Sequence, residues 1–450
     1  MRDNFLRQES PEKLLRCIII HIIAITAIDR IMKRHILLFG FVLLVSLSCE
    51  KNSSDVTKQD VEYGFLSAGA PEALTKAEQE NVAKVNTFAL SMASQLNKSE
   101  KAGFVFSPIS LAYLLGMVSD GAAGETRAEI CKVLGFGFDN QQEINEFCRD
   151  LIVLTSRSES ETLKLANTCV ADCRFPVKEE YRKELHNYYD AMVRNFDFSQ
   201  DDVAGYINQW ASEHTNGKIS KVTDRVSGWL CLANAMYFQG EWSCSFDPFL
   251  TGNQPFYKED GSREDVKMMK MLNRSKIIKY YKGDDFQVAT LGYGQKMIAD
   301  YSMSIFLPDT GTSLSELLSG FDGDKVSSTL SSAKGACVEL IIPKFNVGME
   351  RSIVDDAKAL GINSIFDDSA NFSRMTTESV CVTEMKHFAR VTVDESGTEA
   401  SAVSYAEFDP TAPPPDDGQG LIHFTADHPF LFVITENTTG AILFMGCFRG

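Results

Sequence analysis

Residues 395–411 read Glu-Ser-Gly-Thr-Glu-Ala-Ser-Ala-Val-Ser-Tyr-Ala-Glu-Phe-Asp-Pro-Thr. At the two-residue period of a β-strand, one face of this stretch is uncharged and mostly small, and the other face carries every acidic side chain. A strand with this alternation can slide between two others over a crowded core. The small face comprises Thr398, Ala400, Ala402, Ser404, Ala406 and Phe408.

The same stretch runs directly into residues 409–420, which are rich in Pro, Asp and Gly and predict an exposed loop. An exposed loop patterned like a central strand is a conflict between local and global structure, and such conflicts often mark function. An edge strand followed by a long hairpin loop would explain the alternation. It would not explain why the face turned toward the sheet is so uniformly small.

The composition sets broad limits on the function. The chain has 450 residues, of which 44% are hydrophobic and 23% charged, and this excludes an intrinsically disordered chain. A formal charge of −17 argues against a nucleic-acid partner, because such binding needs a basic face. The 11 cysteines are too sparse for a disulfide scaffold. The length allows about two to three average domains, or one large domain with accessory ends.

The N-terminal region has the pattern of a secretory signal. Lys33 and Arg34 precede an apolar run at 36–47 that ends at Ser48-Cys49. This run is too short to span a membrane, which takes about 20 apolar residues. The Ser48-Cys49 pair resembles the lipobox of bacterial lipoproteins of the Bacteroidetes type, in which the cysteine thiol is acylated. An ordinary signal peptide with an incidental cysteine is the alternative.

Residues 1–48 are therefore predicted to be an upstream segment and a cleaved signal peptide, with Met32 as an alternative start. Residues 49–80 are polar and without a sustained period, which predicts a tether. We expect an exported protein, held by a lipid on Cys49 at the outer membrane or cell surface. Without that lipid, it would be periplasmic or extracellular.

Hydrophobic periodicity in the remainder predicts helices before strands. Apolar residues recur at helical spacing after Asn81, and Ser107-Pro108 offers the preferred start of another helix. This order favours an α+β fold over the strand–helix alternation of a doubly wound fold. Further helices are expected near 179–189, 203–214 and 353–360, and strands at 302–307, 338–342, 391–394, 430–435 and 441–447.

No enzyme motif is found in the chain. It lacks a Gly-x-Ser-x-Gly elbow, a His-Glu-x-x-His zinc motif and a phosphate-binding glycine loop. Cys169 and Cys173 are four residues apart, but no second pair of ligands lies nearby in sequence to complete a metal site. The sequence therefore predicts no catalytic residue, no metal and no cofactor.

Several motifs in the same order resemble the serpin family over nearly all of residues 81–450. Residues 395–400 are similar to the hinge of an inhibitory reactive-centre loop, while Gly292-Tyr293 departs from the Pro-Tyr that the family usually has. The resemblance implies helices packed around three β-sheets, with an exposed loop at about 396–422. The other matching segments are 106–110, 121–126, 207–210, 215–219, 234–242, 343–345, 426–430 and 444–446.

The resemblance also implies that the protein inhibits a serine-type endopeptidase as a suicide substrate. The protease forms an acyl-enzyme with the loop, and the cleaved loop inserts as a new central strand that traps the enzyme. One large or charged side chain on the inserted face would slow this step. By position, the hinge is Glu395, Gly397, Thr398, Glu399, Ala400 and Ala402, the shutter is Ser107, Ser110, Asn234 and His387, and the breach is Trp242, Lys344 and Glu395.

Two interactions are expected within these groups. A neutral His387 hydrogen-bonded to Asn234 would act as a latch beneath the sheet, and a satisfied core histidine is the simpler interpretation of the same residue. Lys344 and Glu395 are expected to form an ion pair at the top of the sheet.

In the family, the scissile residue usually lies at a set distance after the hinge glutamate, and counting forward from Glu395 places the scissile bond at Thr411–Ala412. Counting back from the strand at Phe424 instead places it nearer Pro415, which is a poor acylation site. The small residue after Pro410 favours an elastase-like serine protease. Phe408, for a chymotrypsin-like target, and Asp409 are rival positions. We expect a monomer.

Two other functions remain open. A serpin-fold surface lipoprotein without inhibitory activity would have a binding or structural role, and the small face of the loop argues against it. A surface lipoprotein that binds or hydrolyses nutrients would need a concave polar site, which no motif indicates.

Overall fold

A computed structural model describes residues 73–450 except 138–139, 156–161, 295–298 and 399–419. The described chain forms helices and three β-sheets, so the α+β expectation is confirmed. In the described ranges no helix is both long enough and apolar enough to cross a bilayer.

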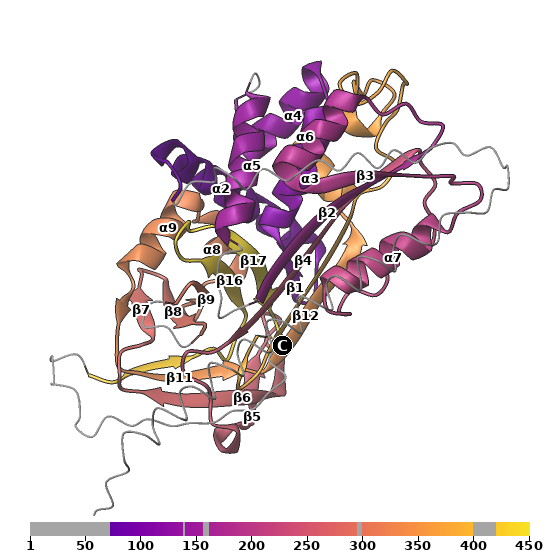
Figure 1. The fold of residues 1–450 in the computed structure, drawn as a ribbon. Helices are drawn as coiled ribbons and strands as arrows, with labels where there is room; N and C mark the ends of the chain where they lie inside the picture. Colours follow the sequence, from indigo (N-terminus) through magenta and orange to yellow (C-terminus); the bar gives the residue numbers. More distant parts are fainter. Residues whose placement is uncertain (1–72, 138–139, 156–161, 295–298, 399–419) are drawn as a thin grey trace, which may run out of the picture. The chain divides into compact units, whose positions relative to one another are not determined.

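A six-stranded sheet holds the hinge of the candidate loop (Figure 1). All its neighbouring strands are antiparallel except β2 and β3, which run parallel. In sheet order the strands are β12 (Phe345–Ser352), β13 (Lys386–Val393), β14 (Gly397–Thr398), β4 (Leu230–Glu241), β2 (Thr162–Asp172) and β3 (Ala191–Phe196).

The other two sheets complete the core. Strands β9 and β16 are buried along their whole length, so they lie at the centre of the seven-stranded sheet. That sheet has the order β1 (Phe104–Phe106), β17 (Ile442–Phe448), β16 (Phe430–Glu436), β9 (Tyr301–Pro308), β8 (Phe286–Gly292), β7 (Lys279–Lys282) and β10 (Lys334–Gly335). The four-stranded sheet has the order β15 (Ile422–Thr425), β11 (Val338–Pro343), β6 (Arg263–Asn273) and β5 (Gly252–Tyr257).

Helices cover both faces of the six-stranded sheet. Helix α3 packs beneath β4 in the main core, whereas α7 lies apart from the other helices, on the opposite face (Figure 1). The helices are α2 (Lys76–Ser99), α3 (Pro108–Gly121), α4 (Gly124–Leu134), α5 (Gln141–Thr155), α6 (Glu179–Tyr189), α7 (Val203–His214), α8 (Leu314–Ser319), α9 (Gly323–Ser332) and α10 (Val354–Leu360), with short 3₁₀ turns η1 (Pro248–Leu250) and η2 (Ser364–Phe366).

The first described helix begins earlier than its apolar spacing predicts. Thr75 and Glu78 form a capping box, in which the threonine hydroxyl accepts from the Glu78 N–H and the glutamate binds the Thr75 N–H. Such a pair satisfies free N–H groups at a helix start. Helix α2 therefore starts at Lys76, and residues 76–80 of the predicted tether belong to it.

The long strand β2 was missing from the expected elements. For β4 only the family resemblance at 234–242 implied a central-sheet strand, and the strand begins earlier, at Leu230. Strand β13 is longer than the predicted 391–394. The inner halves of β2 and β4 are built mainly from Ala, Asn, Thr and Cys, as at 166–169 and 231–235, where the one larger residue is Leu232. These residue types give a weak period-two signal, because helices cover the sheet on both faces and no polar face alternates with an apolar one.

Candidate functional site

A tight turn at Asp394–Gly397 reverses the chain between β13 and β14. The Asp394 carboxylate accepts from the N–H of Ser396 at 2.9 Å and of Gly397 at 3.2 Å. The Asp394 N–H donates to the Gly397 carbonyl at 3.0 Å. An aspartate side chain that accepts hydrogen bonds from the backbone N–H groups two or three residues later in the chain commonly fixes a turn. This turn sets the direction in which the hinge enters the sheet.

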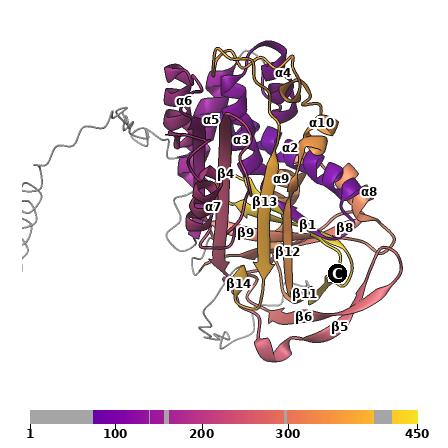
Figure 2. The same cartoon turned by 90° about the vertical axis from the view of Figure 1, so that its right-hand side faces the viewer.

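The hinge residues of β14 already lie between two strands (Figure 2). Gly397 is opposite Glu241, and Thr398 is opposite Gly240 on one side and Val393 on the other. A Cβ at position 397 would lie 2.1 Å from the Gly240 carbonyl oxygen, so the close approach requires glycine. Thr398 is only 1% exposed, so its side chain is in the core.

Tyr293 holds the end of the hinge, a role that the sequence analysis missed. Its hydroxyl lies 2.6 Å from Thr398 Oγ1, and its ring stacks on Trp242 with centroids 4.6 Å apart. Trp242 in turn donates its indole N–H to the Asp394 carbonyl at 2.9 Å and its backbone N–H to the Ser396 carbonyl at 2.8 Å. Burial raises the pKa of Tyr293 well above its ordinary value, so it remains a neutral phenol. In the sequence, the one signal for this role of Tyr293 is that an aromatic residue directly follows the end of a strand.

The expected ion pair at the top of the sheet is present. Lys344 Nζ lies 2.7 Å from Glu395 Oε2, with the two side chains 44% and 16% exposed. Partial burial acts to raise the pKa of Glu395, but the hydrogen bonds from Lys344 and from its own backbone outweigh it, and the pKa lies below its usual value. The Glu395 carbonyl also accepts from the Phe246 N–H at 2.8 Å.

The predicted shutter residues come together beneath the middle of β4 and β13. The Ser107 N–H donates to His387 Nε2 at 3.0 Å, and the Ser107 hydroxyl caps α3 by accepting from the Ser110 N–H at 3.2 Å. The Ser110 hydroxyl donates to the Asn234 side-chain oxygen, and the Asn234 amide donates to Asn167 at 2.6 Å. One polar cluster therefore links helix α3 to three strands of the sheet, β2, β4 and β13.

The structure corrects the expected His387–Asn234 hydrogen bond. The hydrogen bonds of the described residues give His387 the backbone of Ser107 as its partner and give Asn234 the side chains of Ser110 and Asn167. The free N–H groups at the start of α3 need acceptors, and His387 supplies one. Burial lowers the pKa of His387 to about 4, so this ring is neutral at neutral pH, as expected.

Some predicted residues lie outside the described ranges. They are the hinge residues Glu399, Ala400 and Ala402, the reactive bond Thr411–Ala412 and the lipidation residue Cys49.

Beyond Thr398, β4 and β13 have no pairing with each other in the described chain. Among the described residues, β4 pairs with β2 and β13 pairs with β12, and the two edges that face each other pair with β14 at one end. Two facing strand edges of this kind can accept another strand between them, because its N–H and C=O groups can pair on both sides.

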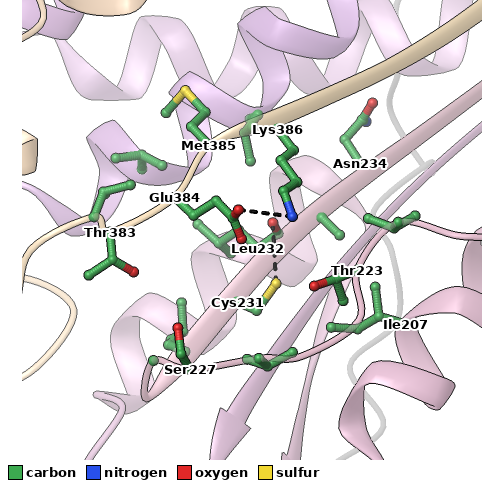
Figure 3. Close-up of a pocket in the computed structure, with 18 of the residues that line it drawn as sticks. Ile207, Thr223, Ser227, Cys231, Leu232, Asn234, Thr383, Glu384, Met385 and Lys386 are labelled. Atoms are coloured by element: carbon green, nitrogen blue, oxygen red, sulfur yellow. Dashed lines mark hydrogen bonds and ion pairs between the residues drawn. The ribbon is translucent and has the colours of Figure 1, made fainter. Parts of the chain in front are cut away.

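A cavity of about 460 Å³ opens between the two strands at the end farthest from β14. Leu232 and Asn234 of β4 line one side, and Thr383 and Met385 line the other (Figure 3). Its remaining wall is mostly apolar, with Leu114 and Val118 of α3, Ile207 and Trp210 of α7, and Phe175, Phe372 and Met375.

No group of three or more potential metal ligands occurs in the described residues. The nine cysteines of the same ranges are free thiols, and Cys169 is buried while Cys173 is exposed. The described part of the site consists of strand edges and a hinge.

Comparisons with known proteins agree with this geometry. Residues 83–449 match the family model described as serpin (serine protease inhibitor). The chain is similar to Serpin-ZX of Arabidopsis thaliana, at 30% identity over 82% of this chain and 97% of that protein. It is also similar to human neuroserpin, at 30% identity over 77% and 86% of the two chains. The solved structure of Arabidopsis AtSerpin1 in its native stressed conformation matches with a TM-score of 0.69 and 29% identity, over 84% of this chain and 99% of that one.

Proposed function

The chain belongs to the serpin family, and from this premise we propose that it is an inhibitory serpin that traps a serine-type endopeptidase as a suicide substrate. Serpins as a family are protease inhibitors, although non-inhibitory members exist. The observation that carries the proposal is the position of β14, because two residues of the small-faced stretch already lie between β4 and β13.

The proposed mechanism uses the edges of β4 and β13 that face each other. The target protease attacks the loop and forms an acyl-enzyme. The cleaved loop then extends β14 into a full strand that pairs with β4 and β13. About a dozen new hydrogen bonds at roughly 1 kcal/mol each make this step effectively irreversible. The bound protease is carried along before water can hydrolyse the ester.

The pattern of the loop favours inhibition over the alternative of a binding or structural serpin. The side chain of Thr398 is buried against Tyr293, which supports the assignment of its face as the one that turns toward the core. Ala400 and Ala402 share that face. Small side chains there allow insertion over a filled core, whereas a serpin without inhibitory function needs no such restriction.

The proposal also names the bond that is cleaved, the class of target protease and the place where the protein acts. We place cleavage at Thr411–Ala412, with an elastase-like protease favoured and a chymotrypsin-like protease possible through Phe408. The protein is proposed to act as a monomer after export, anchored at the outer membrane or cell surface through Cys49, or free in the periplasm or outside the cell if that cysteine is not lipidated.

The test is to incubate the mature protein with elastase-, chymotrypsin- and trypsin-like proteases and to run denaturing gels. An adduct that resists SDS is expected with at least one protease, and mass spectrometry of the released C-terminal fragment locates the bond. If proteases cleave the loop and none forms an adduct, the protein is not an inhibitor.

A further inference from the structure

The chain crosses from one sheet to another at residues 426–429. β15 belongs to the four-stranded sheet and is the first described strand after residues 399–419, whereas β16 lies in the centre of the seven-stranded sheet. The Asp427 carbonyl accepts from the Tyr257 N–H at 2.8 Å, which joins the crossing to the end of β5. The side-chain contacts of this crossing therefore contribute to how firmly β15 is joined to the seven-stranded sheet.

His428 connects the crossing to that sheet. Its Nδ1 lies 2.8 Å from the Asp427 carboxylate, and its Nε2 lies 2.8 Å from the carbonyl oxygen of Pro308, at the end of β9. The pairing of β9 with β16 ends where Phe306 lies opposite Leu431, so the imidazole continues the contact beyond the last paired residues. Pro308 is buried, and a buried carbonyl oxygen needs a donor.

Both partners of the ring are acceptors, and this decides which protonation state fits. A neutral imidazole has one N–H and can donate to one of them, so its other nitrogen would place a lone pair against an oxygen atom 2.8 Å away. An imidazolium has two N–H groups and donates to both. A protonated Asp427 that donates to a neutral ring would need the same additional proton. The complete contact therefore holds one proton more than a neutral histidine beside a carboxylate.

Solvent can exchange this proton, because the side chains of His428 and Asp427 are 26% and 36% exposed. Among the described residues, the Asp427 carboxylate has no hydrogen bond or ion pair except the one with His428. On the β9 side, the next charged residue is Asp309, and its carboxylate is paired with Lys282 Nζ at 2.6 Å. On the β5 side, Tyr257 contributes its backbone N–H. Histidine is the side chain of this group that ordinarily titrates between about pH 5 and pH 8.

From this geometry we propose that His428 is a proton-dependent staple. It joins the crossing after β15 to the seven-stranded sheet through two hydrogen bonds while the ring is an imidazolium, and through one when the ring is neutral. The added stability is present at mildly acidic pH and is lost as the pH rises through the range in which histidines titrate. This direction is opposite to that of His387, whose protonation favours the unfolded chain. The inference is independent of the proposed function, because it concerns the intact protein and needs no protease.

The experiment is amide hydrogen exchange of the intact protein, followed by mass spectrometry at about pH 6 and about pH 8.5. Rates are converted to protection factors, which removes the intrinsic pH dependence of exchange, and the amides of α2 serve as the reference for global stability. In the parent, residues 422–428 should lose about tenfold in protection at the higher pH, because one charge-assisted hydrogen bond is lost. The amides of α2 should not change.

Asp427→Asn separates the contact from the proton. The introduced amide can donate to Nδ1 of a neutral ring, which then donates from Nε2 to Pro308, so both bonds form without the additional proton. This variant should keep its protection at both pH values. His428→Gln keeps at most one of the bonds and should show low protection at both. His423→Gln is the matched control on β15, because its ring is 66% exposed, and it should behave like the parent.

The proposal is overturned if protection of residues 422–428 in the parent does not fall between the two pH values, or if Asp427→Asn shows the same fall as the parent. A fall of equal size in α2 would show a global loss of stability and would also overturn it. If His428→Gln does not fold, the comparison of the parent with Asp427→Asn still decides. A protein that forms no adduct with any protease would refute the proposed function and leave these outcomes unchanged.

Discussion

The hydroxyl of Tyr293 lies 2.6 Å from Oγ1 of Thr398, and both residues are buried. This contact joins the end of β14 to the segment after β8 and holds the hinge between β4 and β13 before any cleavage. Because Tyr293 also stacks on Trp242, which binds the carbonyls of Asp394 and Ser396, the hinge turn and the hinge strand depend on the same aromatic pair.

The first prediction concerns this bond. Tyr293→Phe removes the hydroxyl and leaves Thr398 Oγ1 buried without its partner, which should lower the free energy of unfolding by about 1–3 kcal/mol. Amide exchange at residues 397 and 398 should accelerate in the same variant. Tyr280→Phe is the matched control, since its half-buried hydroxyl donates to Gln287 at 3.3 Å, away from the hinge. Equal effects of the two substitutions would contradict a special role for Tyr293.

The second prediction concerns the Lys344–Glu395 ion pair. Its lysine is 44% exposed, so solvent screens the interaction. A double-mutant cycle with Lys344→Ala and Glu395→Gln should give a coupling of about 0.5–1 kcal/mol in the free energy of unfolding, and this coupling should shrink in high salt. A coupling that does not change with salt would show that packing, and not charge, connects the two residues.

The third prediction concerns pH. The pKa of His387 is about 4 in the folded protein, below the 6.5 of a free histidine, so protonation favours the unfolded chain. The stability that neutral His387 provides is complete above pH 6.5 and is lost as the pH falls toward about 4, by about 3 kcal/mol in total.

His387→Gln should keep an acceptor for the Ser107 N–H and should lose this part of the acid sensitivity in urea unfolding between pH 7 and pH 4. His423→Gln removes a histidine that is 66% exposed and serves as the control. An unchanged pH profile in His387→Gln would show that another group carries the acid sensitivity.

The fourth prediction tests the alternation of the loop. Ala402→Glu places a charge on the inserted face, level with the buried Met236 and Ala389. Burying that charge is costly, so hydrolysis should win over trapping, and the molar ratio of inhibitor consumed per protease trapped should rise at least about tenfold. Ser401→Glu, one residue earlier and level with the exposed Arg390, should change this ratio less than twofold. Similar ratios for the two variants would contradict the assigned face.

Much of the site was predictable because its residues belong to short motifs. The period-two pattern after Glu395 gives the small face, and Ser107-Pro108 gives the start of α3. The helix at 203–214 was also placed correctly, since its apolar residues recur at helical spacing.

Other parts depend on contacts between distant segments. The Tyr293–Thr398 bond joins residues 105 positions apart, and no local pattern reports it. The expected partner of His387 was wrong because a buried histidine accepts from whichever donor the fold brings near, here the backbone of α3. The cavity between β4 and β13 arises from the separation of two strands, which their individual sequences do not encode.

The central claim is that the cleaved loop becomes a strand between β4 and β13. Its most direct test is the melting temperature of the protein before and after a single cut in the loop, with both fragments retained. Insertion adds about a dozen hydrogen bonds and should raise the melting temperature by about 20 °C. A cleaved protein that melts at the same temperature as the intact one, or lower, would contradict the claim.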